Sequence, residues 1–155
     1  MRTVIQRVSK AAVVVDGREV GAVGCGLLVL AGIEQGDTEK DLVWTAEKVV
    51  NLRVFEDAQG KMNLAVGDVS GGILLVPNFT VAGNAQKGRR PSFDSAMAPA
   101  LAEPMFARFV EAVTLAAAGA GVQIPVATGV FRAMMEVSLV NDGPVTIVIS
   151  SRGPM

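Results

Sequence analysis

The chain has 155 residues, of which half are apolar and 19% are charged, so its composition excludes intrinsic disorder over most of its length. This length predicts one domain with a proper hydrophobic core. There is no histidine and a single cysteine, which excludes a Ser-His-Asp or Cys-His triad, a histidine-ligated metal and an intrachain disulfide. Fourteen Lys and Arg stand against fifteen Asp and Glu, so binding to nucleic acid would need a local basic patch.

Two segments of the sequence are relevant to where in the cell the protein is found. Polar side chains interrupt residues 1–7, where a secretory signal needs an apolar run, and this predicts a cytoplasmic protein. Residues 112–131 carry no charge, but glycine and proline interrupt them. We interpret this second segment as a helix end, a turn and a strand rather than a membrane span.

Apolar periodicity and turn residues predict the elements of the first half of the chain. Asp16-Gly17 indicates a hairpin turn, and Thr38 with Asp41 forms a capping-box pattern that predicts a helix over residues 38–51. Cys25, beside an apolar run, is expected to be a small core residue without a role. The strands predicted in this half cover residues 3–8, 11–15, 18–20 and 27–33.

The second half of the chain is predicted to hold further strands and a second helix. A polar loop is expected over residues 82–91, and a helix is expected to begin at Pro104 and end near Gly119. The predicted strands cover residues 54–55, 73–79, 122–126, 133–140 and 145–150. These elements predict the α+β class, with a mixed, mostly antiparallel sheet that is curled or barrel-like, and two main helices.

Pro77-Asn78-Phe79-Thr80, at the end of an apolar strand, is the first candidate site. A hydroxyl, an amide and free backbone N–H groups would meet a ligand there. The alternative interpretation is that the strand simply ends at this point.

The second candidate site is Lys87-Gly88-Arg89-Arg90-Pro91-Ser92-Phe93. Its three cations suit a phosphate backbone, its glycine lets the backbone approach closely, and Phe93 suits stacking on a base. The alternative is a solvated loop.

The third candidate is Asn141-Asp142-Gly143-Pro144-Val145-Thr146, between two apolar strands. An ordinary hairpin turn uses the same residue types, and that is the alternative interpretation. A cis bond before Pro144 would redirect the neighbouring carbonyl groups. Arg7, on the same strand face as Ile5, is a possible fourth member of the site, although many such arginines lie at a sheet edge.

These segments, in this order, resemble the D-aminoacyl-tRNA deacylase family, also known as the D-tyrosyl-tRNA deacylase family, along essentially the whole chain. The most specific match is the family signature Asn-x-Gly-Pro-Val-Thr, which is present at residues 141–146. A second signature, Ser-Gln-Phe-Thr-Leu, reads Pro77-Asn78-Phe79-Thr80-Val81 here. The other resembling segments are residues 5–8, 26–30, 60–64 and 88–93.

The resemblance implies that residues 1–155 form one deacylase domain of a cytoplasmic homodimer. It implies hydrolysis of the ester that joins a D-amino acid, or the glycine of glycyl-tRNA(Ala), to the 3′-terminal adenosine of tRNA. It implies no metal or organic cofactor and no membrane partner.

The resemblance also implies roles for particular residues. Gly143 and Pro144 would form a cis turn that enters the partner's pocket, where its carbonyl groups grip the substrate's amino group. Arg7, with Asn141, Val145 and Thr146, would support that turn. The catalytic residues would be Asn78, Phe79 and Thr80, with Phe79 and Thr80 beside the scissile ester. The residues that bind the tRNA would be Lys87, Arg89, Arg90 and Phe93.

Two mechanisms are known for the family, with Thr80 as nucleophile or with the ribose 2′-hydroxyl assisting a water. We favour the second, because no candidate base accompanies Thr80 in the sequence. An aminoacyl ester is activated, so orientation and backbone N–H groups supply much of the acceleration.

This chain departs from the family pattern at Pro77, Asn78 and Met134, the last at a position where the family usually has an acidic residue. The alternatives are a deacylase with relaxed chiral selectivity, a non-catalytic tRNA-binding protein, a structural dimer and a small-molecule esterase. Arg7 accompanies the cis turn in the family pattern, so we predict that selectivity for D substrates is retained.

Overall fold

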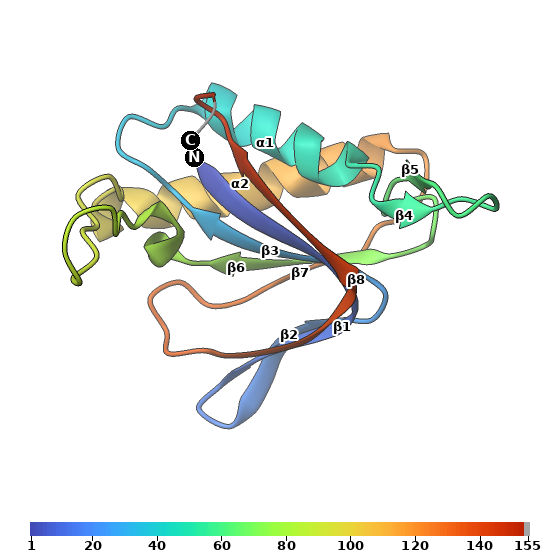
Figure 1. Ribbon diagram of the computed structural model, residues 1–155, viewed down its shortest axis with the longest axis horizontal. Coiled ribbons are helices and arrows are strands. Elements are labelled where there is room, and N and C mark those ends of the chain that lie inside the picture. Colours follow the sequence, from blue (N-terminus) through green and yellow to red (C-terminus); the bar gives the residue numbers. More distant parts are fainter. Residues whose placement is uncertain (154–155) are drawn as a thin grey trace.

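The computed structural model describes residues 1–153 and consists of a curled sheet with two helices packed on one face (Figure 1). The strands are β1 (Arg2–Val15), β2 (Arg18–Val23), β3 (Gly26–Gly32), β4 (Phe55–Glu56), β5 (Met62–Leu64), β6 (Gly72–Pro77), β7 (Val126–Thr128) and β8 (Glu136–Ser150). The helices are α1 (Glu39–Asn51) and α2 (Pro99–Gly119), and a short 3-10 helix, η1 (Phe79–Ala82), follows β6. The predicted α+β class, with a mixed sheet that is curled or barrel-like and two main helices, is confirmed.

Strand β1 organises the sheet because it pairs with three other strands. One of its edges pairs antiparallel with β8 along almost its whole length, and the other edge is shared by β3 and β2. Strands β3, β6 and β7 continue the sheet as parallel neighbours. The sheet curls until β2 approaches β7, where a Cβ on Gly21 would lie 2.5 Å from the Thr128 carbonyl oxygen. Glycine at this position permits that close approach.

Alternation along the central strands divides the core between the two faces of the sheet. Leu27 and Val29 of β3 face the helices, where they join a cluster that includes Phe109 of α2. Leu28 of β3 and Leu74 of β6 point to the opposite face and fill the inside of the curl. Because β3 and β6 are buried on both faces, they appear in the sequence as continuous apolar runs.

Helix α1 begins at the capping box predicted from Thr38 and Asp41. The Thr38 N–H and the Thr38 hydroxyl each donate to Asp41 Oδ2 at 2.8 Å. Burial by itself raises the pKa of Asp41, but hydrogen bonds from Ser151 and Thr38 outweigh it and lower this pKa from 3.8 to about 2. The cap is therefore strongest when Asp41 is ionised.

Helix α2 begins five residues earlier than predicted. Pro99, rather than Pro104, occupies the first turn, where a proline has no N–H that needs a partner. Pro104 lies inside the helix near its N-terminal end, on the exposed side. Residues 112–131 comprise the end of α2, a turn and β7, as predicted, and no helix within residues 1–153 is long and apolar enough to cross a membrane.

The sequence predictions divided the long strands wrongly. The strands predicted over residues 3–8 and 11–15 are one strand, β1, and those predicted over residues 133–140 and 145–150 are one strand, β8, which begins at residue 136. Each is continuous because β1 and β8 pair along their lengths and the pairing resumes after each register shift. β6 ends at Pro77 rather than at residue 79, β7 covers residues 126–128 rather than 122–126, and β5 was not predicted. Cys25 is exposed rather than in the core, because it lies in the short connection between β2 and β3.

Candidate active site

The segment after β6 is held by its own side chains. Asn78 caps η1: its Oδ1 accepts the Thr80 N–H at 3.1 Å and the Thr80 hydroxyl at 2.5 Å. The short asparagine side chain suits this position, since a cap must reach back to an N–H only two residues away. The first candidate site is therefore an ordered turn that presents a half-exposed Phe79 and an exposed Thr80.

The chemistry available at this turn is that of hydroxyl and backbone groups. The Thr80 hydroxyl donates a hydrogen bond to the amide oxygen of Asn78, and an amide is too weak a base to activate a hydroxyl nucleophile. Within residues 1–153, no acceptor is bonded to the backbone N–H of Phe79. The turn therefore offers one free backbone donor next to a hydroxyl whose oxygen can still accept hydrogen bonds.

A cleft of about 670 Å³ opens beside the turn. Asn78 and Phe79 line it on one side, and the segment between β7 and β8 lines it on the other. Most of the remaining lining is apolar or aromatic: Leu30, Val76, Pro77, Phe93, Met97, Ala102, Phe106, Phe131, Met134, Met135 and Val137. The volume and the aromatic lining suit a flat organic group such as a nucleobase.

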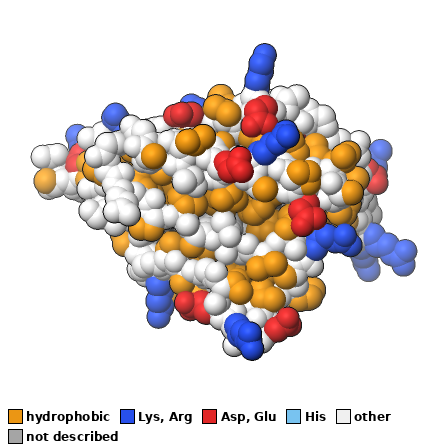
Figure 2. Space-filling view, turned by 180° about the vertical axis from the view of Figure 1, so that it is seen from behind, with side chains coloured by type: hydrophobic (Ala, Val, Ile, Leu, Met, Phe, Trp, Pro, Cys, Tyr) orange, Lys and Arg blue, Asp and Glu red, His pale blue; other side chains and the backbone are white. Residues whose placement is uncertain are grey.

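The basic loop adjoins the same turn. Asn84 and Ser92 pair through two backbone hydrogen bonds of 2.8 Å, which close the base of the loop. Phe93 packs edge-to-face on Phe79, with ring centroids 5.1 Å apart, so the loop and the turn are joined directly. The loop beyond this base carries three exposed cations, Lys87, Arg89 and Arg90. None of them has an ion-pair partner in the part of the chain that the structure describes. In the space-filling view, hydrophobic side chains cover much of one face and Lys and Arg side chains gather at an edge (Figure 2).

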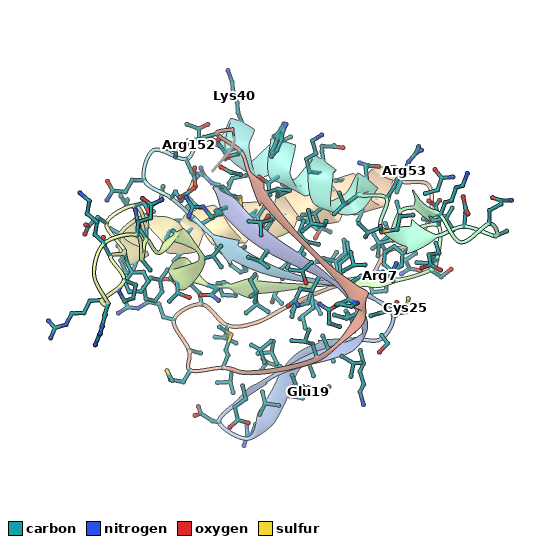
Figure 3. The ribbon with its side chains drawn as sticks, viewed as in Figure 1. Arg7, Glu19, Cys25, Lys40, Arg53 and Arg152 are labelled. Atoms are coloured by element: carbon teal, nitrogen blue, oxygen red, sulfur yellow. The ribbon has the colours of Figure 1, made fainter. Side chains whose placement is uncertain are left out.

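Arg7 holds the third candidate segment. It is only 6% exposed, and its guanidinium donates to the carbonyl oxygens of Asp142 at 3.1 Å and of Val54 at 2.6 Å. Its Nε also lies 3.2 Å from the Asp142 carboxylate. The alternative that Arg7 lies at a sheet edge is therefore wrong: it is buried beside β8, where Figure 3 shows it.

Residues 142–145 form a protrusion in the middle of β8 rather than a hairpin turn. Gln6 pairs with Thr146 but Val8 pairs with Asn141, so the strand gains extra residues opposite Arg7. Asn141 closes the base of the protrusion: its Oδ1 accepts the Val145 N–H at 2.9 Å and its amide donates to Thr146 Oγ1 at 3.1 Å. The Gly143–Pro144 peptide bond is cis, and both residues are exposed.

Within one chain, the protrusion and the Asn78–Thr80 turn lie far apart. Arg7 pairs with Leu27, and Leu27 pairs with Ile73 at the start of β6. The turn follows the other end of β6, so at about 3.3 Å per residue the two segments are separated by roughly 15–20 Å along the strand direction alone, and β8 is also three strands away from β6 in the sheet. The structure therefore brings the first two candidate sites together and leaves the third outside that group.

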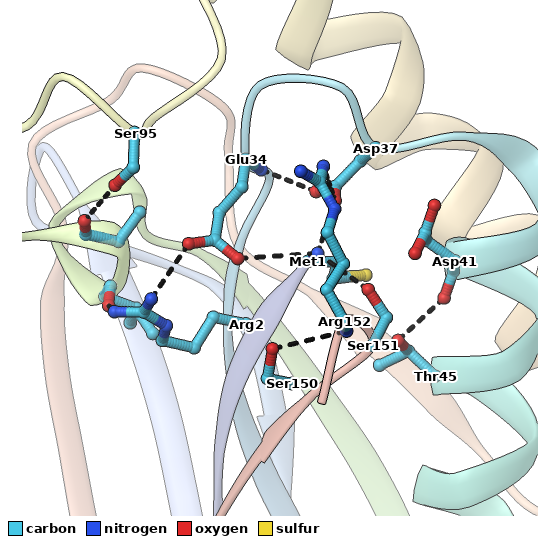
Figure 4. Close-up of polar contacts among 12 residues, drawn as sticks. Met1, Arg2, Glu34, Asp37, Asp41, Thr45, Ser95, Ser150, Ser151 and Arg152 are labelled. Carbon is cyan, nitrogen blue, oxygen red and sulfur yellow. Dashed lines mark hydrogen bonds and ion pairs between the residues drawn. The ribbon is translucent and has the colours of Figure 1, made fainter. Parts of the chain in front are cut away.

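A polar network behind the turn was missed at the sequence level (Figure 4). Arg2 donates to the Val81 carbonyl oxygen at 3.4 Å and pairs with Glu34 at 3.0 Å, and Ser95 donates to the Ala82 carbonyl oxygen at 2.5 Å. Glu34 also lies 3.5 Å from the amino group of Met1. The only signal in the sequence was the position of charged residues at the ends of apolar strands, and that signal does not identify partners.

Among residues 1–153, no group of three or more Cys, Asp or Glu side chains lies close enough together to hold a metal ion.

Comparison with known proteins identifies the family. The family D-Tyr-tRNA(Tyr) deacylase matches residues 4–150. The D-aminoacyl-tRNA deacylase of Geobacter metallireducens is 56% identical over 97% of this chain and 96% of its own length, and that of Kosmotoga olearia is 53% identical over 98% of both chains.

Two solved structures share the fold of this chain. The c-Myc DNA Unwinding Element Binding Protein matches with a TM-score of 0.88 and 38% identity over 100% of both chains. A probable eukaryotic D-amino acid tRNA deacylase shares the fold, with a TM-score of 0.75 at 17% identity over 96% of this chain and 97% of its own. The chain belongs to the D-Tyr-tRNA(Tyr) deacylase family and is a hydrolase of the D-aminoacyl-tRNA deacylase type.

Proposed function

We propose that this enzyme hydrolyses the ester of D-aminoacyl-tRNA and of glycyl-tRNA(Ala), and that it works as a homodimer in which each active site uses residues of both copies. Water adds to the ester carbonyl carbon, the bond to the ribose 3′-oxygen breaks, and free amino acid and tRNA are released. The substrate implies a cytoplasmic location, since aminoacyl-tRNA is made there. Lys87, Arg89 and Arg90 contact the tRNA backbone, and Phe93 lies beside the terminal nucleotides.

The observation that carries this proposal is the separation of the two halves of the site. The exposed Gly143-Pro144 protrusion and the Thr80 turn are too far apart in one chain to touch one aminoacyl group. A second copy related by a two-fold axis supplies the missing half, and the same contact is then made twice. The edge of β8 that faces away from β1 has no strand partner within residues 1–153, which supports docking of another chain beside it.

Chiral selection follows from the rigidity of the protrusion. Arg7 and Asn141 fix its backbone, so its carbonyl oxygens accept an ammonium group from one direction only. A D side chain then points out of the pocket, whereas an L side chain points into the wall. Glycine has no side chain to clash and is accepted.

The site residues of the turn act as positioning groups. The Phe79 N–H faces the developing oxyanion, and the Thr80 hydroxyl accepts a hydrogen bond from the terminal ribose. The ribose 2′-hydroxyl orients the attacking water and helps transfer its proton to the 3′-oxygen. This assignment is supported by the amide partner of Thr80, which leaves that hydroxyl without a base.

Hydrolysis of matched D-alanyl-tRNA, L-alanyl-tRNA and glycyl-tRNA tests the function. We expect rapid release of D-alanine and glycine and no enzyme-dependent release of L-alanine. Equal release of D- and L-alanine would mean that Pro77 and Asn78 relax the selectivity, and tRNA binding without release would mean a non-catalytic tRNA-binding protein.

A further inference from the structure

Arg132 is the one charged residue among those that line the 670 Å³ cleft in the described chain. It lies between β7 and β8, next to Phe131, and the other lining residues are apolar apart from Asn78. A guanidinium at the rim of an apolar, aromatic cleft provides a strong attraction for an anion.

The backbone of Arg132 shows that this position is structurally demanding. Its φ angle is +61°, in the left-handed region that long side chains rarely adopt. Glycine and asparagine adopt this conformation more readily, yet an arginine stands here. Unfavourable backbone conformations of this kind are concentrated at ligand-binding positions.

The positive charge of Arg132 also has no acidic partner within residues 1–153. In residues 1–153, Arg132 forms no ion pair and no side-chain hydrogen bond, whereas the guanidinium groups of Arg2, Arg7 and Arg152 all have acidic partners. Arg132 is exposed, so its charge is available to a molecule that enters the cleft.

We infer that Arg132 binds a backbone phosphate next to the terminal nucleotide of the tRNA, an inference that rests on the proposed function. The aminoacylated end carries two kinds of charge, an ammonium group on the amino acid and phosphodiesters on the nucleotides. A guanidinium repels the first and forms charge-assisted hydrogen bonds with the second. The terminal base then stacks on the aromatic wall, with its phosphate at the rim beside Arg132.

Two substrates separate this role from a general effect on the site. One is D-alanyl-tRNA, and the other is 3′-O-D-alanyl-adenosine with a free 5′-hydroxyl, which keeps the ester and lacks every phosphate. Arg132→Asn removes the cation and suits the left-handed backbone, so folding is not compromised. Arg132→Lys keeps the charge, and Arg18→Asn removes an exposed cation on β2, outside the cleft.

We expect Arg132→Asn to lower kcat/KM on D-alanyl-tRNA by roughly tenfold, mostly through KM, because one charge-assisted hydrogen bond is lost. On D-alanyl-adenosine its activity equals that of the wild type. The dependence of log KM on log salt concentration becomes shallower by about 0.7, the value for one contact to a single strand. Arg132→Lys recovers most of the loss, and Arg18→Asn behaves as the wild type.

Several results would overturn the inference. If Arg132→Asn kept the wild-type kcat/KM on D-alanyl-tRNA, Arg132 would not contact a phosphate. An equal loss of kcat/KM on both substrates would assign Arg132 to the ester site. A change of oligomeric state in Arg132→Asn would assign the cation to the subunit interface. Failure of the proposed function looks different, since the wild type would then hydrolyse neither substrate.

Discussion

The Arg7 guanidinium lies between two carbonyl oxygens, 3.1 Å from that of Asp142 on β8 and 2.6 Å from that of Val54 after α1. These two segments are distant in the sequence, and one buried side chain fixes the protrusion relative to the body of the protein. A Cβ at Gly143 would lie 2.8 Å from the same guanidinium, so the arginine also packs against the tip.

Replacing Arg7 by lysine should reduce catalysis more than folding. The ammonium of lysine cannot occupy both positions of the planar fork, so the protrusion loses its orientation. We expect kcat/KM on D-alanyl-tRNA to fall by about tenfold or more, from the loss of a buried charged hydrogen bond. Arg18→Lys, on the exposed start of β2, serves as the control in the same assay. Full activity in Arg7→Lys would show that the guanidinium geometry is unimportant.

Asn78 should matter through its oxygen atom. Asn78→Ala removes the cap of η1 and should lower the free energy of unfolding by about 1 kcal/mol, together with most of the activity. Asn78→Asp keeps an acceptor at the same position and should retain the stability of the turn. Thermal unfolding and deacylation measured on both variants distinguish these outcomes. If Asn78→Ala unfolds at the wild-type temperature, the side chain does not hold the turn.

Thr80 and the ribose 2′-hydroxyl can be compared directly. Thr80→Val preserves the shape of the side chain and removes its hydroxyl, and we expect substantial residual turnover because that hydroxyl only positions groups. A D-alanyl-tRNA that ends in 2′-deoxyadenosine should lose nearly all turnover with the wild-type enzyme. Complete inactivity of Thr80→Val, with normal turnover of the deoxy substrate, would instead identify Thr80 as the nucleophile.

Asp41 should make stability depend on pH in the acid range. Its pKa falls from 3.8 to about 2 in the folded protein, so its contribution is complete above about pH 4 and is lost as the pH falls towards 2. Because the carboxylate is partly exposed, solvent screening reduces the effect, and Asp41→Asn should cost about 1 kcal/mol at pH 7. Urea unfolding of both proteins between pH 2 and pH 7 measures this difference. A difference that does not shrink below pH 3 would show that the charge of Asp41 is not the cause.

The sequence predicted features that depend on neighbouring residues. The capping box of Thr38 and Asp41 and the buried run of β3 are local patterns, and the structure confirms both. Asn141-Asp142-Gly143-Pro144 is also local, but its residue types serve a hairpin and a protrusion equally well. Only the long pairing of β8 with β1 makes it a protrusion.

The remaining differences have similar causes. Pro99 and Pro104 both suit the start of a helix, and the packing of α2 on the sheet decides between them. The ion pair of Arg2 with Glu34 joins two strand ends that are far apart in the sequence, so no spacing predicts it. The roles of Thr80 and Gly143 came from the family resemblance, and their distance in one chain is a property of the fold.

The claim that each active site uses both subunits is tested most directly by mixing two inactive proteins. One carries Asn78→Ala and Thr80→Ala, which damage the turn, and the other carries Gly143→Ala, whose Cβ would clash with Arg7 and Val145 in the protrusion. After unfolding and refolding together, half of the dimers contain one chain of each kind, and each of these has one intact site. We predict recovery of about one quarter of wild-type activity, as a symmetric dimer requires. Absence of any recovery, with mixed dimers present, would contradict a shared active site.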